Sequence, residues 1–349
     1  MSKFIVPIGY MGSGSSAVTD LISEIDCVDN KSGSFEYIFL HCPNGVFDLE
    51  DKLLIGNNAI RSDEAIHSFY ETMKDLNYKR FWWPSGYKKI FHNKFMDIVN
   101  QYIEEIIDIK IDSFWYYQEN PKSFMYIKVF FERVIRKLFK GTIHIKKPLR
   151  YETMWLSYKS EEEFYRLTNK FISNILSCLS YDKADIVIDQ LILPHNLYRV
   201  PKYFDDKFYF IVVERDPRDI FILNKYIWSG RNTGVPYSRD VEQFCEQYKA
   251  IRKMERSCDN INLFKIKFED LVYNYEMMCK KIFDFLGYDC DKHTKQYQYF
   301  DPAKSIKNTQ VYLMDPKYND EVKYIEKHLS SYLYDFPYAN NTSVDEIFD

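Results

Sequence analysis

The stretch Phe4-Ile5-Val6-Pro7-Ile8-Gly9-Tyr10-Met11-Gly12-Ser13-Gly14-Ser15-Ser16 decides the fold. An apolar run passes into a glycine-rich turn, and residues 17–25 follow with apolar side chains at helical spacing. This order predicts a strand, a tight turn and a helix. Glycine permits positive φ and close approach of an anion, and the first turn of the helix adds unpaired N–H groups. The segment is therefore predicted to hold a phosphate group.

The turn departs from the loop of nucleoside triphosphatases at one position. Gly9, Gly14 and Ser16 match the pattern G-x-x-x-x-G-K-[ST], but Ser15 stands where the pattern has lysine. That lysine reaches the β- and γ-phosphates in phosphoryl transfer, so its absence counts against this chemistry. Backbone N–H groups and the hydroxyls of Ser13, Ser15 and Ser16 could still hold one phosphate. The alternative is a plain glycine-rich connection that binds nothing.

The composition predicts a globular protein of one large or two ordinary domains. The chain has 349 residues and a net charge of −4, so no overall positive field would attract nucleic acid or an anionic membrane. Its seven cysteines are scattered without a C-x-x-C pair, which argues against a zinc site or a disulfide framework. No signal peptide and no long apolar segment is apparent. We expect a soluble, cytoplasmic protein without a transmembrane segment.

Strand and helix patterns alternate along the chain. Strands are predicted at 4–8, 35–40, 184–189, 208–213 and 261–267, and residues 142–158 could contain more. Helices are predicted at 17–25, 63–77, 87–107, 124–139, 161–179, 217–228, 238–257, 274–286 and 317–333. The apolar runs at 184–189 and 208–213 are typical of strands buried in a parallel sheet. We expect an α/β, P-loop-type fold of three layers with a central, mainly parallel sheet.

In such a fold, ligands bind at the carboxyl ends of the strands. We expect a single domain, 1–349, in which 60–180 is a large, mainly helical insertion. This insertion could form a subdomain that binds the substrate.

A second polar segment, Glu214-Arg215-Asp216-Pro217-Arg218-Asp219, follows the predicted strand 208–213. Arg215 would lie at the carboxyl end of this strand, where a planar and permanently charged guanidinium suits a phosphate monoester. The alternative is a surface ion-pair cluster that caps the helix starting at Pro217.

Together, the glycine-rich loop and this arginine resemble the sulfotransferase superfamily, whose members take sulfuryl from 3′-phosphoadenosine 5′-phosphosulfate. In that family, the first loop holds the 5′-phosphosulfate side and a strand-end R-[DN]-P-x-D segment holds the 3′-phosphate. Residues 268–272 (FEDLV), 282–287 (IFDFLG) and 301–309 (DPAKSIKNT) also resemble the family, the last of these being similar to its late loop that closes over the nucleotide. Among relatives, the chain looks most like bacterial proteins associated with surface polysaccharides.

The resemblance implies a site for the sulfuryl donor. Its expected residues are Gly9, Gly12, Ser13, Gly14, Ser15, Ser16, Arg215 and Asn224. Two positions depart from the family: Gly12 replaces a lysine or arginine, and Leu223 replaces a serine, with Asn224 beside it as a substitute donor. The missing positive charge could come from Lys307, our first choice, or from Lys304, Lys146, Lys147 or Arg150.

Sulfuryl transfer also needs a base that takes the proton of the acceptor hydroxyl, and it needs no metal ion. The candidates by location are Asp189, Glu36, His41, Asp48 and His195. Asp189 ends an apolar strand and is the leading candidate, although aspartates in such places also form turns and helix caps.

The resemblance makes a carbohydrate the expected acceptor, either a surface polysaccharide or its precursor. The aromatic side chains of 60–180 would suit sugar rings, and they would equally suit a hydrophobic core. Two other functions stay open. One is a P-loop kinase or nucleoside triphosphatase in which Ser15 or Ser16 and Asp189 hold Mg²⁺. The other is a non-catalytic nucleotide-binding or scaffold protein of the same fold.

Overall fold

The computed structural model describes residues 2–30, 33, 35–115, 118, 125–139, 149–179, 184–231, 235–256, 258–259 and 261–339, with only the backbone at 230–231. The chain divides into two compact units. The first comprises Met1–His41 and Leu176–Asp349, and the second comprises Cys42–Ile175. The second unit contains most of the range 60–180, whose role as an inserted subdomain stays a prediction.

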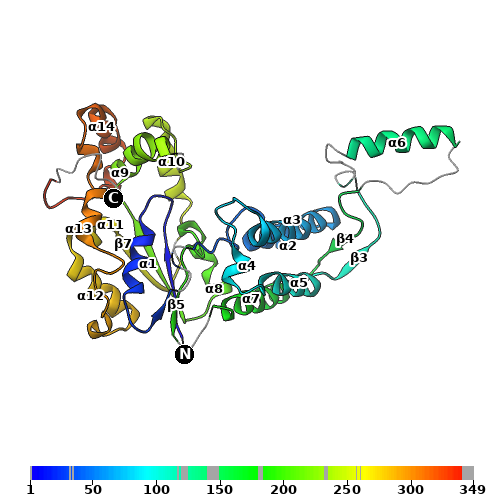
Figure 1. Ribbon diagram of the computed structural model, residues 1–349, viewed down its shortest axis with the longest axis horizontal. Coiled ribbons are helices and arrows are strands. Elements are labelled where there is room, and N and C mark those ends of the chain that lie inside the picture. The colour runs from blue at the N-terminus through cyan, green and yellow to red at the C-terminus, as the bar shows by residue number, and fades with distance from the viewer. Residues whose placement is uncertain are drawn as a thin grey trace. The chain divides into compact units, whose positions relative to one another are not determined.

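The first unit is built on a five-stranded parallel sheet (Figure 1). Its strands, in spatial order, are β2 (Val28–Asp29), β5 (Asp185–Val187), β1 (Phe4–Ile8), β6 (Phe208–Glu214) and β7 (Asn262–Lys267). Every neighbouring pair is parallel, with Ile8 opposite Val212 and Val213 opposite Ile266. The carboxyl ends of the strands therefore share one edge. The predicted α/β fold with a central parallel sheet is confirmed.

Helices cover this sheet because its strands are apolar on both faces. The helices of the first unit are α1 (Ser15–Ser23), α8 (Val200–Tyr203), α9 (Pro217–Ile222), α10 (Val241–Lys253), α11 (Phe268–Tyr273), α12 (Tyr275–Leu286), α13 (Pro302–Ser305) and α14 (Asn319–His328). Apolar residues of α1 and α12 pack on Ile211 and Val213. Since side chains alternate along a strand, Phe208 and Phe210 face the other way, where the Phe204 ring packs 4.6 and 5.7 Å from theirs.

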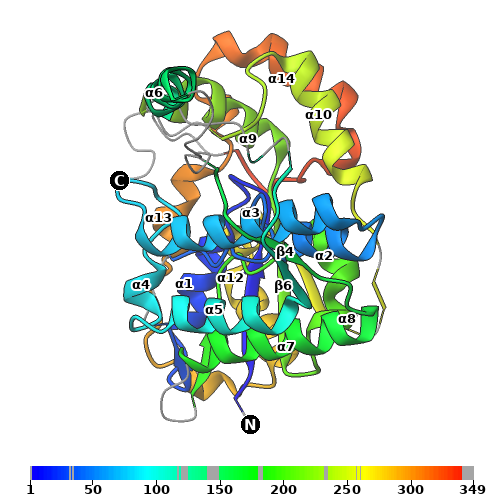
Figure 2. The same ribbon diagram turned by 90° about the vertical axis from the view of Figure 1, so that its right-hand side faces the viewer.

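The second unit is mainly helical. It contains α2 (Val46–Leu54), α3 (Ala59–Tyr78), α4 (Tyr87–Ile90), α5 (Phe95–Ile106), α6 (Met125–Leu138), α7 (Glu161–Ser177) and a small antiparallel sheet of β3 (Ile109–Ile111) and β4 (Met154–Leu156). Helices α3, α5 and α7 run side by side (Figure 2). Their aromatic residues form a common core, in which the rings of Tyr102 and Phe171 stack at 4.5 Å and Phe69 meets both edge-on.

Two predictions of secondary structure are wrong. Residues 35–40 form no strand, and the strand beside β5 is β2. Tyr37 and Phe39 are buried, so packing in the core rather than strand pairing explains these aromatic residues. The predicted helix 87–107 is broken into α4 and α5, since His92 and Asn93 between them adopt positive φ. Helices α2, α8, α11 and α13 were not predicted, and residues 142–148 lie outside the described part of the chain.

Candidate functional site

The loop between β1 and α1 depends on its glycines. The φ angle is +82° at Gly12 and +86° at Gly14, which glycine adopts without strain. A Cβ atom on Gly9 would lie 2.0 Å from Ser13 Oγ, and one on Gly14 would lie 2.8 Å from the Phe268 ring. Larger residues would clash at both positions, so close packing dictates the glycines of this loop.

Several hydrogen-bonding groups of the loop lack a partner within the described residues. Ser13 is 2% exposed, and its Oγ makes no hydrogen bond there. The backbone N–H groups of Gly14, Ser15 and Ser16 make none either, and no side chain caps the helix. A buried hydroxyl without a partner costs about 1–3 kcal/mol. This set of groups fits an anion that accepts hydrogen bonds at the start of α1.

Gln190, three residues after the end of the neighbouring strand β5, fixes the loop. Its Nε2 donates to Ser15 Oγ at 2.8 Å, and its Oε1 accepts from the backbone N–H of Gly9 at 3.5 Å. Its own N–H donates to the Pro7 carbonyl at 3.0 Å, and its φ is +56°. The sequence analysis missed this residue. Its place directly after Asp189, at the end of a strand beside β1, is the signal that would have found it.

Asp189 is buried beside the loop, and its Oδ1 has no hydrogen-bond partner in the described part of the chain. Burial raises the pKa of Asp189 to about 8, and the Glu36 carboxylate adds to this effect. A hydrogen bond from Thr19 acts in the opposite direction. The carboxyl group is therefore mostly protonated at pH 7 and is a stronger base than an ordinary aspartate once ionised.

The other candidate bases lie in different surroundings. His41 Nε2 donates to the Gln190 carbonyl at 2.9 Å, and burial lowers the pKa of His41 to about 4. Burial also lowers the pKa of His195 and so disfavours its charged form. Burial raises the pKa of Glu36. Asp48 belongs to the second unit, where it accepts from a backbone N–H at 2.6 Å.

Arg215 follows the last residue of β6 and contacts the glycine-rich loop. Its Nη1 donates to the Gly12 carbonyl at 3.2 Å, its Nη2 donates to the Asn308 carbonyl, and the guanidinium lies 4.9 Å from the centre of the Phe268 ring. The residue is 4% exposed, and its Nε has no partner among the described residues. The loop, the strand-end arginine and the segment 301–309 are therefore brought together in space.

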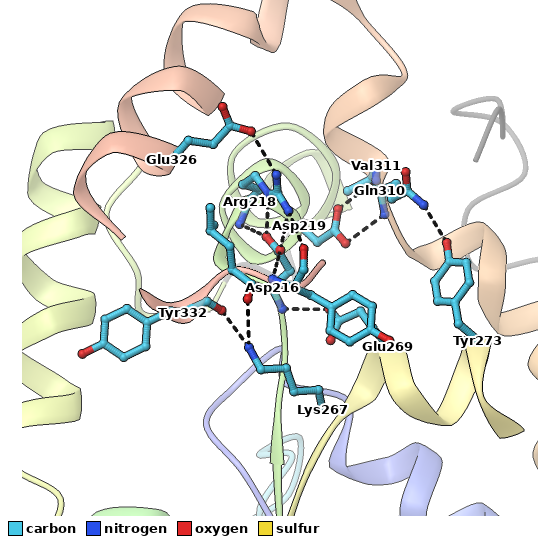
Figure 3. A network of polar contacts seen from close by, with 12 residues as sticks. Asp216, Arg218, Asp219, Lys267, Glu269, Tyr273, Gln310, Val311, Glu326 and Tyr332 are labelled. Carbon is cyan, nitrogen blue, oxygen red and sulfur yellow. Dashed lines mark hydrogen bonds and ion pairs between the residues drawn. The ribbon is translucent and has the colours of Figure 1, made fainter. Parts of the chain in front are cut away.

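The two aspartates that follow Arg215 hold the surrounding backbone in place (Figure 3). Asp216 accepts from the backbone N–H of Arg218 at 2.8 Å and from its Nη2 at 2.7 Å. Asp219 accepts from the N–H groups of Gln310 and Val311 at 2.9 and 2.8 Å. The ion pair and helix cap considered as an alternative do exist between Asp216 and Arg218, but they are buried rather than at the surface.

Glu269 completes this buried network. Its Oε1 accepts from the backbone N–H of Asp216 at 2.8 Å, and the residue is 0% exposed. Burial raises the pKa of Glu269 to about 8, and Asp216 raises it further. A neutral Glu269 leaves more of the positive charge of Arg215 uncompensated. Burial also lowers the pKa of Arg215, but a guanidinium stays protonated at neutral pH.

The remaining predicted site residues differ in whether their side chains already make hydrogen bonds within the fold. Asn224 braces a loop, since its Nδ2 donates to the Tyr237 carbonyl at 3.0 Å and its Oδ1 accepts from the Val235 N–H at 3.2 Å. Leu223 is fully buried. Lys307 makes no hydrogen bond or ion pair in the described part, and it lies next to a carbonyl that the strand-end arginine contacts. The Asn224 side chain is thus already used within the fold, and a role for Lys307 at the site stays a prediction.

The other candidate cations are exposed, belong to the second unit or lie outside the described residues. Lys304 is exposed, and Arg150 belongs to the second unit. Lys146 and Lys147 lie outside the described residues. Within the described ranges, no cluster of three or more His, Cys, Asp or Glu side chains could hold a metal ion. None of the described helices is both long and apolar enough to cross a membrane.

A family model described as the sulfotransferase family matches residues 134–292. The matched range contains β6, Arg215 and residues 268–272, and it leaves out the glycine-rich loop. The resemblance to the sulfotransferase superfamily is confirmed. The narrower likeness to surface-polysaccharide proteins stays a prediction. No curated protein matches the sequence.

Three solved sulfotransferase structures are similar to this chain. The sulfotransferase domain of the Synechococcus PCC 7002 olefin synthase is 14% identical, covers 96% of this chain and 95% of its own, and has a TM-score of 0.41. The sulfotransferase domain of the curacin biosynthetic pathway is 12% identical, with coverage of 96% and 99% and a TM-score of 0.41. Sulfotransferase STF9 of Mycobacterium avium is 11% identical, with coverage of 97% and 78% and a TM-score of 0.37.

Proposed function

We propose that this chain is a sulfotransferase that takes sulfuryl from 3′-phosphoadenosine 5′-phosphosulfate. The observation that carries the proposal is the 3.2 Å hydrogen bond between Arg215 and the Gly12 carbonyl. It joins the glycine-rich loop to the strand-end arginine, so an anion at the loop and a second phosphate beside the arginine would occupy one continuous site. Two elements suited to anions therefore lie side by side. This arrangement supports a donor nucleotide that carries a 3′-phosphate and a 5′-phosphosulfate.

The residues of this site fit such a donor. Gly12 and Gly14 open the loop, and Ser13 Oγ and the N–H groups of Ser15 and Ser16 offer hydrogen bonds to the phosphosulfate side. Arg215 has five N–H donors, and its Nε is buried without a partner among the described residues. No metal ion is required, since these donors and a cation can neutralise the leaving phosphate.

The proposed reaction moves one sulfuryl group and one proton. An acceptor hydroxyl oxygen bonds to sulfur as the bond from sulfur to the bridging phosphate oxygen breaks. Asp189 takes the hydroxyl proton, and Lys307 offsets the negative charge of the leaving phosphate. Only about a tenth of Asp189 is ionised at pH 7 if its pKa is about 8, so the rate should rise with pH through this value.

We propose a carbohydrate hydroxyl as the acceptor, as part of surface-polysaccharide synthesis. Exposed aromatic side chains of the second unit support this choice, since Phe81 and Trp83 are 107% and 63% exposed and such rings suit sugars. The seven cysteines are free thiols, which fits a reducing compartment and supports a cytoplasmic location.

Calorimetric titration tests the donor. We expect 3′-phosphoadenosine 5′-phosphate to bind without Mg²⁺ and more tightly than ATP. Arg215→Ala should weaken this binding by about 1.5–3 kcal/mol, the range for hydrogen bonds to charged groups, and should affect AMP much less. Lys304→Ala is the matched control, because it removes an exposed positive charge from the segment 301–309, which Arg215 contacts at the Asn308 carbonyl.

Each other outcome has a definite meaning. Equal losses for both nucleotides in Arg215→Ala would contradict its role at the 3′-phosphate. A preference for ATP with Mg²⁺ would favour phosphoryl transfer instead. Failure of either nucleotide to bind would favour a scaffold protein of this fold.

A further inference from the structure

Helix α6, Met125–Leu138, carries a continuous apolar face that is exposed in the described part of the chain. None of its 14 residues is buried. At about 100° per residue, six apolar side chains fall on one face of the helix. They are Ile127, Phe130, Phe131, Val134, Ile135 and Leu138. Their exposed fractions reach 64% at Phe130 and 71% at Leu138. Contiguous apolar surface of this kind marks an interaction site in soluble proteins.

Basic side chains surround this apolar face. Lys128 and Lys137 lie at its two edges, and Arg133 and Arg136 lie on the opposite side. The helix has four basic side chains and one acidic one, Glu132, so its net charge is +3, whereas that of the whole chain is −4. The helix is therefore positively charged, although the net charge of the whole chain is negative.

We propose that α6 binds in the plane of an anionic lipid bilayer surface. Its apolar face would enter the boundary between head groups and acyl chains, and Lys128 and Lys137 would contact the negative head groups. Charge complementarity favours this partner. A second copy of α6 would bring two helices of net charge +3 together, and a soluble anionic polymer would leave the six apolar side chains in water.

This inference does not depend on the donor or the chemistry of the proposed transfer. It concerns a helix of the second unit and assigns the protein a membrane-surface partner, while none of the described helices could span the bilayer. A surface location would suit acceptors that are held on a membrane.

Co-sedimentation of the full chain with vesicles tests the proposal. We expect binding to mixed vesicles of phosphatidylglycerol and phosphatidylcholine, weak binding to phosphatidylcholine alone, and weaker binding at high salt. Ile127→Asn with Leu138→Asn should lower partitioning at least about tenfold, because two apolar side chains no longer enter the bilayer. The matched control is Ile55→Asn with Leu313→Asn, which changes side chains that are 67% and 50% exposed elsewhere and should bind like the wild type.

The charge contribution can be measured separately. Lys128→Gln with Lys137→Gln should lower partitioning into the mixed vesicles about tenfold and leave the weak binding to phosphatidylcholine unchanged. Since α6 buries no side chain, these variants should keep the circular dichroism of the wild type. Hydrogen exchange should show slower exchange at 125–138 when anionic vesicles are present.

Two results would overturn the proposal. One is that the wild-type chain does not bind anionic vesicles, or that the α6 variants bind them as well as the wild type does. The other is an oligomer, seen by light scattering, that the α6 substitutions convert to monomer without any vesicle binding, because the helix would then serve a second copy of the chain.

Discussion

Two sets of buried polar groups at the carboxyl edge of the sheet differ in how their hydrogen bonds are satisfied. The Asp219 carboxylate accepts from two backbone N–H groups, those of Gln310 and Val311, and is 0% exposed. Asp189 and Ser13 are almost as buried, at 4% and 2%, but Asp189 Oδ1 and Ser13 Oγ have no partner in the described part. At similar burial, both Asp219 oxygens are therefore hydrogen-bonded, whereas one Asp189 oxygen and the Ser13 hydroxyl are not.

The difference separates structural residues from candidate binding residues. A satisfied carboxylate stabilises the backbone that it holds, whereas a buried polar atom without a partner lowers stability and needs another explanation, such as a ligand. Substitutions in the first set should therefore lower the free energy of unfolding. Substitutions in the second set should change binding and pH dependence while leaving stability equal or higher.

The largest expected effect comes from Asp219→Ala. This change leaves the N–H groups of Gln310 and Val311 buried without acceptors, and each such loss costs about 1–3 kcal/mol. We expect the free energy of unfolding, measured in urea, to fall by about 2–6 kcal/mol. Nucleotide binding should weaken as well, because Asp219 positions the segment that follows Lys307.

Asp219→Asn is the matched control for this substitution. The amide oxygen keeps one acceptor, so the loss of stability should be roughly half that of the alanine variant. An alanine variant as stable as the wild type would show that water satisfies these N–H groups. The distinction between the two sets would then fail.

Asp189→Asn should have the next largest effect, and with the opposite sign. Burial raises the pKa of Asp189 from 3.8 to about 8, so between these values the folded protein binds a proton that the unfolded chain has lost. Stability conferred by the protonated group is complete below pH 4 and declines as pH rises towards 8. Asparagine stays neutral, so the variant should be more stable than the wild type by on the order of 2–5 kcal/mol at pH 8.

Urea unfolding from pH 4 to pH 8 measures this difference, and a transfer assay with the same variant should show a large loss of rate. Asp206→Asn changes an exposed aspartate and should follow the wild-type pH profile. If Asp189→Asn and the wild type lose stability in parallel as pH rises, Asp189 is ionised throughout and the fold stabilises its buried carboxylate.

The same physical distinction explains what the sequence could predict of the fold. The apolar runs at 184–189 and 208–213 pointed to buried parallel strands because both faces of such strands need apolar residues, and these runs contain β5 and most of β6. The strand predicted at 35–40 is wrong, because buried irregular segments and buried strands contain the same kinds of aromatic residue. The break between α4 and α5 depends on the positive φ of two residues that fit a helical pattern.

Local signals likewise found part of the candidate site. Glycine spacing identified the loop, and a position at a strand end identified Arg215. Gln190 contacts Ser15 across 175 residues, and Glu269 contacts Asp216 across 53, so only the folded chain shows what these two residues do. The unsatisfied oxygen that distinguishes Asp189 from the similarly buried Asp219 is also a tertiary property.

Ser13→Ala should have the smallest effect and gives the finest test of the comparison. The change removes a buried hydroxyl that has no partner in the described residues, so the free energy of unfolding should stay equal or rise slightly. If Ser13 Oγ donates to the donor nucleotide, affinity for 3′-phosphoadenosine 5′-phosphate should fall by about 0.5–1.5 kcal/mol. Urea unfolding and calorimetry measure the two quantities on the same preparation.

Ser15→Ala, two residues away, provides the contrast. Ser15 Oγ accepts from Gln190 Nε2 at 2.8 Å, so its removal leaves a buried donor unpaired and should lower the free energy of unfolding by about 1 kcal/mol. If Ser13→Ala lowers stability as much as Ser15→Ala and leaves nucleotide affinity unchanged, the Ser13 hydroxyl is structural and does not mark the binding site. Opposite responses of two serines in one loop would locate the anion at Ser13, because the two variants differ only in whether the protein itself already uses the hydroxyl.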